Sequence, residues 1–164
     1  MKRKITLILF INILFINSLF AYNNENKCED YLSKDKPAEA IIAAKSLASK
    51  YDSNFCAAKA KYYQNDYEGA IESFERSTQH AELQADQMYS ILYKGIVQRD
   101  NSEIKASTIT FKHGLETAKL GNSKYMQMEQ KFLYQLGLSL TAMKDYFNAT
   151  DYLAKSLMIA ANDD

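Results

Sequence analysis

The chain has 164 residues, of which 47% are hydrophobic and 24% are charged, and its 20 basic residues balance its 20 acidic ones. This length suits one compact domain or a short repeat array and excludes two sizeable catalytic domains. The composition excludes disorder of the whole chain, and the balanced charge removes the main argument for nucleic-acid binding. Five glycines and one proline are too few for many strands joined by tight turns, so we predict an all-α protein.

The first residues have the pattern of a secretory signal peptide. Three basic residues at positions 2–4 precede an apolar run over 5–16, and a short segment ends at Ala21 before polar residues begin. A basic head, an apolar core and a small-residue end are typical of such leaders. We therefore expect residues 1–21 to be a signal peptide and residues 22–164 to form the exported domain. The alternative is an uncleaved anchor, which would have only about 17 residues, the lower limit for spanning a bilayer.

Export would change two properties of the remaining chain. Removing the three basic residues of the leader from the total of 20 leaves 17, against 20 acidic residues, and so a net charge of −3. In an oxidising compartment Cys28 and Cys56 can form a disulfide, whereas in cytosol they would be reduced thiols; the sequence leaves both outcomes open. A metal site is not predicted, because His80 and His113 lie far from these cysteines without ligand spacing.

A pattern of small and large residues recurs four times in the rest of the chain, at separations of 30, 37 and 42 residues. The last copy begins at Gly137, and a Lys-Asp-Tyr turn over 144–146 divides it. Its other marker residues are Ala149, Leu153 and Ser156. Matching offsets give Gly95, Ser107, Phe111 and Gly114; Ala58, Ala70, Phe74 and Ser77; and, more weakly, Cys28, Ala40, Ala44 and Leu47.

This pattern resembles the tetratricopeptide repeat (TPR) family, whose repeat is about 34 residues long. Small residues allow two antiparallel helices to approach closely, and large residues fill the space beside them. The resemblance covers about residues 24–161 and implies an all-α, right-handed superhelical array of about four helical hairpins. The helices are expected at about 24–34, 37–50, 53–64, 67–80, 82–99, 102–120, 123–143 and 146–161.

Individual residues within these helices carry further expectations. Asp66, Ser102, Ser123 and Asp145 are candidates for N-caps, and Gly121 is expected to end a helix. The repeat places three further glycines at points where helices touch, namely Gly95, Gly114 and Gly137.

No motif for catalysis or cofactor binding is recognisable. The sequence contains no glycine-rich phosphate loop, no His-Glu-x-x-His and no nucleophile elbow. His80 falls near a predicted helix end, where a cation is mildly favoured, and His113 lies beside Gly114 on a predicted second helix. Since no nucleophile–base set can be named, we expect a protein that is not an enzyme and that binds no cofactor or metal.

The first helices of the hairpins contain the candidate binding residues. In TPR proteins the inward-facing residues of these helices form a concave peptide groove, and Tyr and Arg are common anchors in partner binding. The alternative is that some of the tyrosines pack between adjacent hairpins. The positions transferred by matched offset are Asp52, Phe55, Lys59, Tyr62, Tyr63, Tyr89, Leu92, Ile96, Arg99, Lys131, Tyr134, Leu138 and Thr141.

Two functions follow from these observations. We predict a non-enzymatic adaptor of the bacterial envelope, in the periplasm or at the cell surface, that binds a protein or peptide segment in the groove. The alternative is a structural subunit of an envelope secretion, pilus or outer-membrane assembly, which associates through an uncapped, apolar last helix. That end would also allow a homo-oligomer. Nucleic acid is not an expected partner, and membrane contact is expected only if the N-terminal segment is retained.

Overall fold

The computed structural model describes residues 27–161 of the chain. The predicted signal peptide, residues 1–21, lies outside the described part. Between residues 27 and 161, no helix has both the length and the apolar character needed to cross a membrane.

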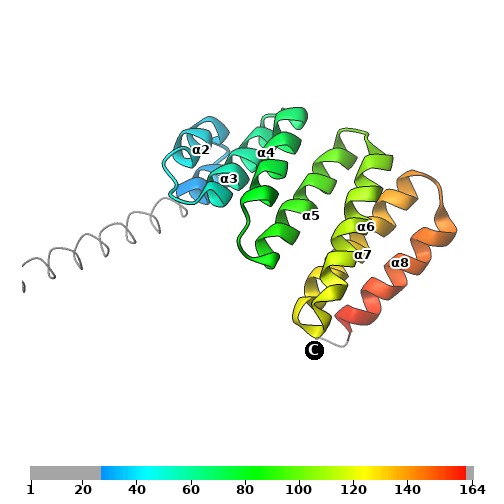
Figure 1. Ribbon diagram of the computed structural model, residues 1–164. Helices are drawn as coiled ribbons and strands as arrows, with labels where there is room; N and C mark the ends of the chain where they lie inside the picture. The colour runs from blue at the N-terminus through cyan, green and yellow to red at the C-terminus, as the bar shows by residue number, and fades with distance from the viewer. Residues whose placement is uncertain (1–26, 162–164) are drawn as a thin grey trace, which may run out of the picture.

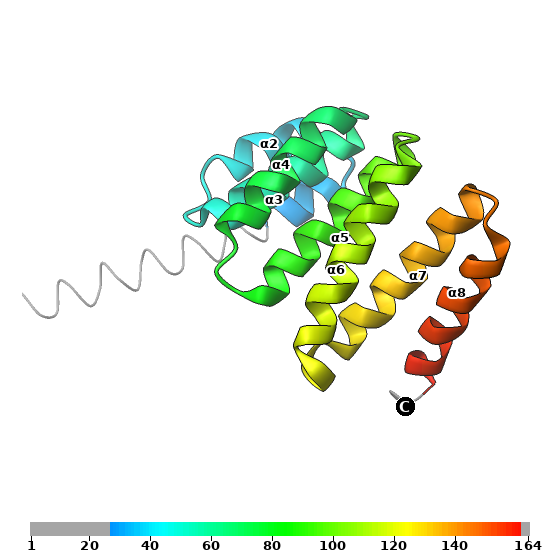
Figure 2. The same ribbon diagram turned by 45° about the vertical axis from the view of Figure 1, so that its right-hand side comes forward.

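The described residues form an all-α array. Residues 27–33 are helical, and α3 packs against α4, α5 against α6, and α7 against α8 as hairpins, which stack side by side (Figures 1 and 2). This arrangement confirms the predicted tetratricopeptide-like architecture. The remaining elements are α2 (Pro37–Ala44), α3 (Lys50–Tyr63), α4 (Tyr67–His80), α5 (Gln84–Asp100), α6 (Ile104–Leu120), the 3-10 helix η1 (Asn122–Tyr125), α7 (Met126–Ala142) and α8 (Tyr146–Ala160).

The four hairpins close with the same backbone turn. At each turn one residue other than glycine has a positive φ, between 55° and 65°, and the next N–H donates to the carbonyl oxygen five residues earlier. In the second hairpin this bond joins the Asp66 N–H to the Lys61 carbonyl at 2.9 Å. This is the Schellman motif of helix ends. The left-handed residues are Asp35, Asn65, Ser102 and Lys144, and their separations equal those of the sequence repeat.

The glycines mark close helix contacts, as predicted. A Cβ atom on Gly95 would overlap the Phe111 ring, and one on Gly137 would lie 2.5 Å from Cγ of Leu153. Gly114 has the same relationship to Phe132, but across neighbouring hairpins. The small residue therefore provides the space that the large side chain of the packed helix occupies.

The core consists of three clusters that follow the array. The largest joins α5, α6 and α7 around the fully buried Met88, Phe111 and Phe132. A smaller cluster joins the first hairpin to α3 of the second, and there the structure links Cys28 to Cys56 in a disulfide, with a Cα–Cα distance of 6.2 Å. Of the two outcomes that the sequence left open, the structure contains the pair.

Several predicted helix ends were wrong. Helix α2 ends at Ala44 instead of continuing to residue 50, because the Ser49 hydroxyl accepts the Asp52 N–H at 3.2 Å and begins α3. Ser102 is not an N-cap, since it is the left-handed residue of a Schellman turn. Ser123 lies inside η1, so α7 begins only at Met126.

The remaining end predictions were confirmed. The Asp66 carboxylate accepts the Gly69 N–H at 3.0 Å, and the Asp145 carboxylate accepts the Asn148 N–H at 3.3 Å, so both residues are N-caps. Gly121 follows the last residue of α6.

Candidate functional site

The first helices of successive hairpins, α3, α5 and α7, adjoin one another. Contacts join α3 to α5 and α5 to α7, so residues that are 30 to 42 positions apart in the sequence meet along one surface. We call this surface the first-helix face; it consists of the predicted binding residues on α3, α5 and α7. Its side chains form direct contacts across both helix boundaries.

A hydrogen bond joins α3 to α5 at one end of the first-helix face. The Tyr62 hydroxyl donates to the Asp100 carboxylate. Burial and this bond to the negatively charged Asp100 together raise the pKa of Tyr62 to about 12. Tyr62 is therefore a fixed, protonated donor at neutral pH and is half-buried, which makes it part of the floor of this face.

Lys59 is held at the same boundary by a charge pair and an aromatic ring. Its ammonium lies 2.6 Å from a Glu29 carboxylate oxygen and 5.9 Å from the centre of the Tyr93 ring. Tyr93 in turn contacts Phe55 edge-on, with ring centres 5.5 Å apart. The basic charge of Lys59 is thus already neutralised within the chain, while Phe55 belongs to the aromatic packing beneath.

The boundary between α5 and α7 has a different chemistry. The Lys131 ammonium lies 5.0 Å from the centre of the Tyr89 ring and 3.4 Å from its hydroxyl oxygen. Arg99 donates to the Gln135 side-chain oxygen and also lies 3.5 Å from Asp100. Among the ion pairs of residues 27–161, Lys59 and Arg99 have carboxylate partners and Lys131 has none. Lys131 is therefore the cation of this face that is open to an acidic group.

The predicted residues differ in their accessibility. Tyr63, Tyr89 and Tyr134 expose 54%, 37% and 46% of their surface. Leu92 is only 6% exposed and belongs to the core around Phe111, so it supports the face from below. The half-buried members are Phe55, Lys59, Tyr62, Ile96, Arg99, Lys131 and Leu138.

An acidic hollow lies at the N-terminal ends of α3 and α5. It has a volume of about 470 Å³, and its lining includes Tyr51, Asp52 and Asp86. Burial, and next the charge of Asp52, raise the pKa of the Asp86 carboxyl. The first-helix face therefore has neighbouring carboxylates at the N-terminal ends of α3 and α5, and Asp86 lies one helical turn before Tyr89, the ring that contacts Lys131. Within residues 27–161, no cluster of three or more His, Cys, Asp or Glu side chains could hold a metal ion.

Four contributors were missed by sequence reasoning: Glu29, Tyr93, Asp100 and Gln135. Each is the partner of a predicted residue across a helix boundary. The repeat offsets identify which positions face inward, but they do not define how adjacent hairpins are shifted along their axes. The pairing of Glu29 with Lys59 gave no signal in the sequence.

The fold is that of a tetratricopeptide-like helical repeat protein. No protein-family profile matches the sequence, and a search of curated proteins finds no match. The chain is similar to two crystal structures of MamA. One has a TM-score of 0.68 at 12% identity, covering 94% of this chain and 86% of MamA; the other has 0.66 at 14% identity, covering 90% and 76%. At this identity the likeness establishes the fold alone.

Proposed function

We propose that this protein is a non-enzymatic adaptor that binds a protein or peptide segment along its first-helix face. The observation that carries the proposal is that each of three adjoining helices exposes a tyrosine, namely Tyr63, Tyr89 and Tyr134. Tyrosine presents a large, rigid, partly apolar surface at a small entropic cost and is enriched in binding hot spots. The similar MamA structures support the scaffold, and this architecture commonly uses extended helical surfaces for binding.

The charges of the first-helix face favour a partner of defined character. Lys59 and Arg99 are neutralised inside the chain, whereas Lys131 is held over a ring and has no carboxylate partner among residues 27–161. A bound segment with an acidic side chain at Lys131 and apolar or aromatic side chains on the tyrosines would complement this surface. The N-terminal pattern supports export, and so we propose that the partner is an envelope protein.

The test is affinity capture from bacterial envelope extract, followed by mass spectrometry. We expect the wild-type chain to retain specific proteins that the Tyr63→Ala/Tyr89→Ala/Tyr134→Ala variant loses, because three exposed contact rings are removed. The control is Tyr146→Ala, which removes a tyrosine that is 62% exposed on α8, outside the first-helix face. Circular dichroism should show equal helix content for all three proteins. Equal capture by wild type and triple variant would refute binding at this face.

A second function has support from α8, which exposes several large apolar side chains. A structural subunit of an envelope assembly would cover them permanently. In that case capture would depend on α8 and be insensitive to the triple tyrosine variant.

A further inference from the structure

The outward face of α8 is the most apolar exposed surface of any described helix. Phe147 is 87% exposed, Leu157 is 70% exposed and Tyr146 is 62% exposed. The residue that matches Leu157 in the preceding repeat, 42 positions earlier, is Leu115, which is 6% exposed and packs with Phe132 of α7. That side of α8 is thus buried in the preceding hairpin and exposed at α8, the last described helix in Figure 2. On the outward side, matching positions are exposed in both helices, but the charged Lys105 and Glu116 of α6 are replaced in α8 by Phe147 and Met158.

The spacing along α8 defines a narrow stripe. Phe147, Asp151, Ala154 and Met158 follow one another at intervals of four, three and four residues, the spacing of a seam between two paired helices. We call these residues the α8 stripe. Ala154, near its middle, is small enough to let a second helix approach closely, while Phe147 stands at one end and Met158 at the other.

We propose that the α8 stripe binds the same stripe of a second copy of this chain, with the two α8 helices antiparallel about a two-fold axis. A two-fold contact requires one surface to be complementary to itself, and the stripe satisfies this condition. When Phe147 lies opposite Met158 of the second copy, Asp151 lies opposite Ala154. In the same register Asp151 of each helix comes next to Lys155 of the other.

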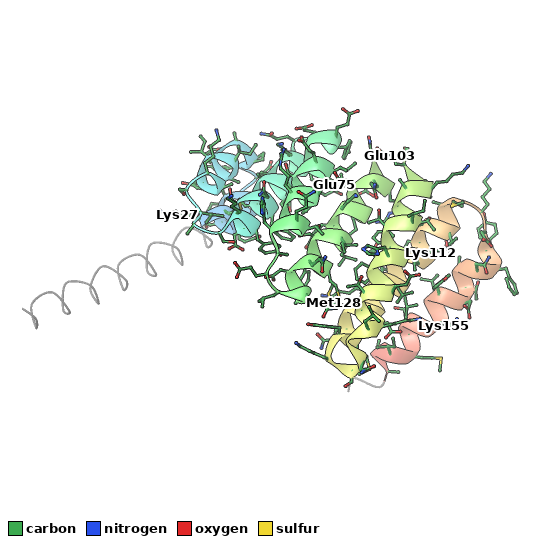
Figure 3. All side chains as sticks on the ribbon, viewed as in Figure 1. Lys27, Glu75, Glu103, Lys112, Met128 and Lys155 are labelled. Carbon is green, nitrogen blue, oxygen red and sulfur yellow. A yellow bond between two sulfur atoms is a disulfide. The ribbon has the colours of Figure 1, made fainter. Side chains whose placement is uncertain are left out.

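The charges select the antiparallel arrangement. Lys155 and Asp151 form an exposed ion pair within α8, at 2.6 Å, and Figure 3 labels Lys155 on this helix. In an antiparallel pair two carboxylates and two ammonium groups alternate at the centre of the contact. In a parallel pair Asp151 would face Asp151, which like-charge repulsion disfavours.

The shape of the surface agrees with this register. A hollow of about 350 Å³ adjoins the C-terminal half of α8 and is lined by Leu133, Met158 and Ile159, with Lys119, Glu129 and Lys155. In the antiparallel pair Phe147 of the second copy lies beside Met158 and Ile159, where its ring can enter this hollow.

Residues 27–33, at the opposite end of the array, expose mostly charged and polar side chains. That end is a poor match for α8, so head-to-tail stacking is disfavoured.

The first test measures molecular mass by light scattering, on protein expressed from residues 1–164. Intact mass spectrometry establishes the N-terminus of each sample. We expect a dimer that dissociates on dilution over an about hundredfold range. Phe147→Glu should weaken dimerisation by about tenfold or more, as loss of an interface anchor does. The matched control is Ile42→Glu, the same change at a residue that is 68% exposed on α2.

The second test exchanges charges. Asp151→Lys alone and Lys155→Asp alone should each weaken the dimer, because both put like charges together at the two-fold axis. The double exchange Asp151→Lys/Lys155→Asp should restore dimerisation, since the pairs between copies are rebuilt in reverse. The helical circular dichroism should be unchanged, and capture through the first-helix face should persist in every variant.

Two results would overturn the proposal. One is a wild-type protein that stays monomeric throughout the dilution range. This result would refute pairing of two copies even if another partner or the retained N-terminal segment covered α8. The other is a dimer that neither Phe147→Glu nor the single charge variants weaken. Neither result would test binding at the first-helix face, which the capture experiment tests separately.

Discussion

Phe111 of α6 lies so close to Gly95 of α5 that any side chain at position 95 would overlap its ring. Both residues are buried, and the contact belongs to the packing of the third hairpin. The fourth hairpin has the same relationship between Gly137 and Leu153. A glycine in a helix interior costs about 1 kcal/mol relative to alanine, so these glycines are retained where close helix packing requires them.

Gly95→Ala should therefore destabilise the protein despite the better helix propensity of alanine. Overpacking of a filled core costs about 1–3 kcal/mol, and we expect a net loss of about 1–2 kcal/mol in the free energy of unfolding by urea. The double variant Gly95→Ala/Phe111→Leu should recover part of this loss, because leucine is the residue opposite Gly137 in the fourth hairpin. A Gly95→Ala protein as stable as wild type would contradict the packing.

In the turn between α7 and α8, we expect a substitution by glycine to stabilise the protein. Lys144 has a φ of 63°, a conformation that glycine adopts without the steric cost carried by other residues. Lys144→Gly should raise the free energy of unfolding by about 0.5–1 kcal/mol. Lys112→Gly, in the interior of α6, is the control and should lower it by about 1 kcal/mol. Thermal unfolding measures both; equal signs for the two variants would exclude the Schellman turn at Lys144.

These two cases show which parts of the fold were predictable from sequence. The pairing of small with large residues, as in Gly95 with Phe111, depends on local offsets, and so the hairpins could be found. The left-handed turn at Ser102 was mistaken for an N-cap, because serine favours caps and glycine is the usual signal for such turns. Gly121 is the converse case: it is a glycine directly after a helix, yet its φ is −87° and its backbone is not left-handed.

For the candidate site, the sequence predicted which helices contribute residues, but not which of those residues are exposed or which contacts they form. Matched offsets placed Tyr89 and Tyr134 on the exposed face, but they placed Leu92 there too, and it lies in the core. The reason is that α5 contacts helices of both neighbouring hairpins, so a larger part of its circumference is covered. Pairs such as Tyr62 with Asp100 depend on the axial shift between hairpins, which no repeat offset contains.

The disulfide should contribute strongly to the stability of the first hairpin. Cys28 and Cys56 are separated by 28 residues, and closing a loop of this length in the unfolded chain stabilises the folded state by about 3.5 kcal/mol in the chain-entropy description. We expect dithiothreitol to lower the unfolding midpoint of the wild type. Cys28→Ser/Cys56→Ser should unfold at that lower midpoint with or without dithiothreitol. A wild-type midpoint that reductant leaves unchanged would contradict this role.

In the acidic hollow, we expect replacing the Asp86 carboxylate by a neutral side chain to raise the stability of the protein by an amount that depends on pH. Burial and the neighbouring Asp52 raise the pKa of Asp86, so the folded state binds this proton more tightly than the unfolded state. The stability from this group is present at low pH and is lost as the pH rises through the folded-state pKa. At neutral pH the charged Asp86 is therefore unfavourable, and Asp86→Asn should stabilise the protein by less than about 1 kcal/mol, since the group is partly exposed.

The gain from Asp86→Asn should shrink as the pH falls through the raised pKa of the Asp86 carboxyl, because the wild-type group then becomes protonated. Urea unfolding at a series of pH values measures this difference. Glu116→Gln removes an exposed carboxylate of α6 and should give a small difference that does not follow the same curve. A destabilised Asp86→Asn protein at neutral pH would mean that Asp86 has a favourable partner, and the hollow would then not be a site of mutual carboxylate repulsion.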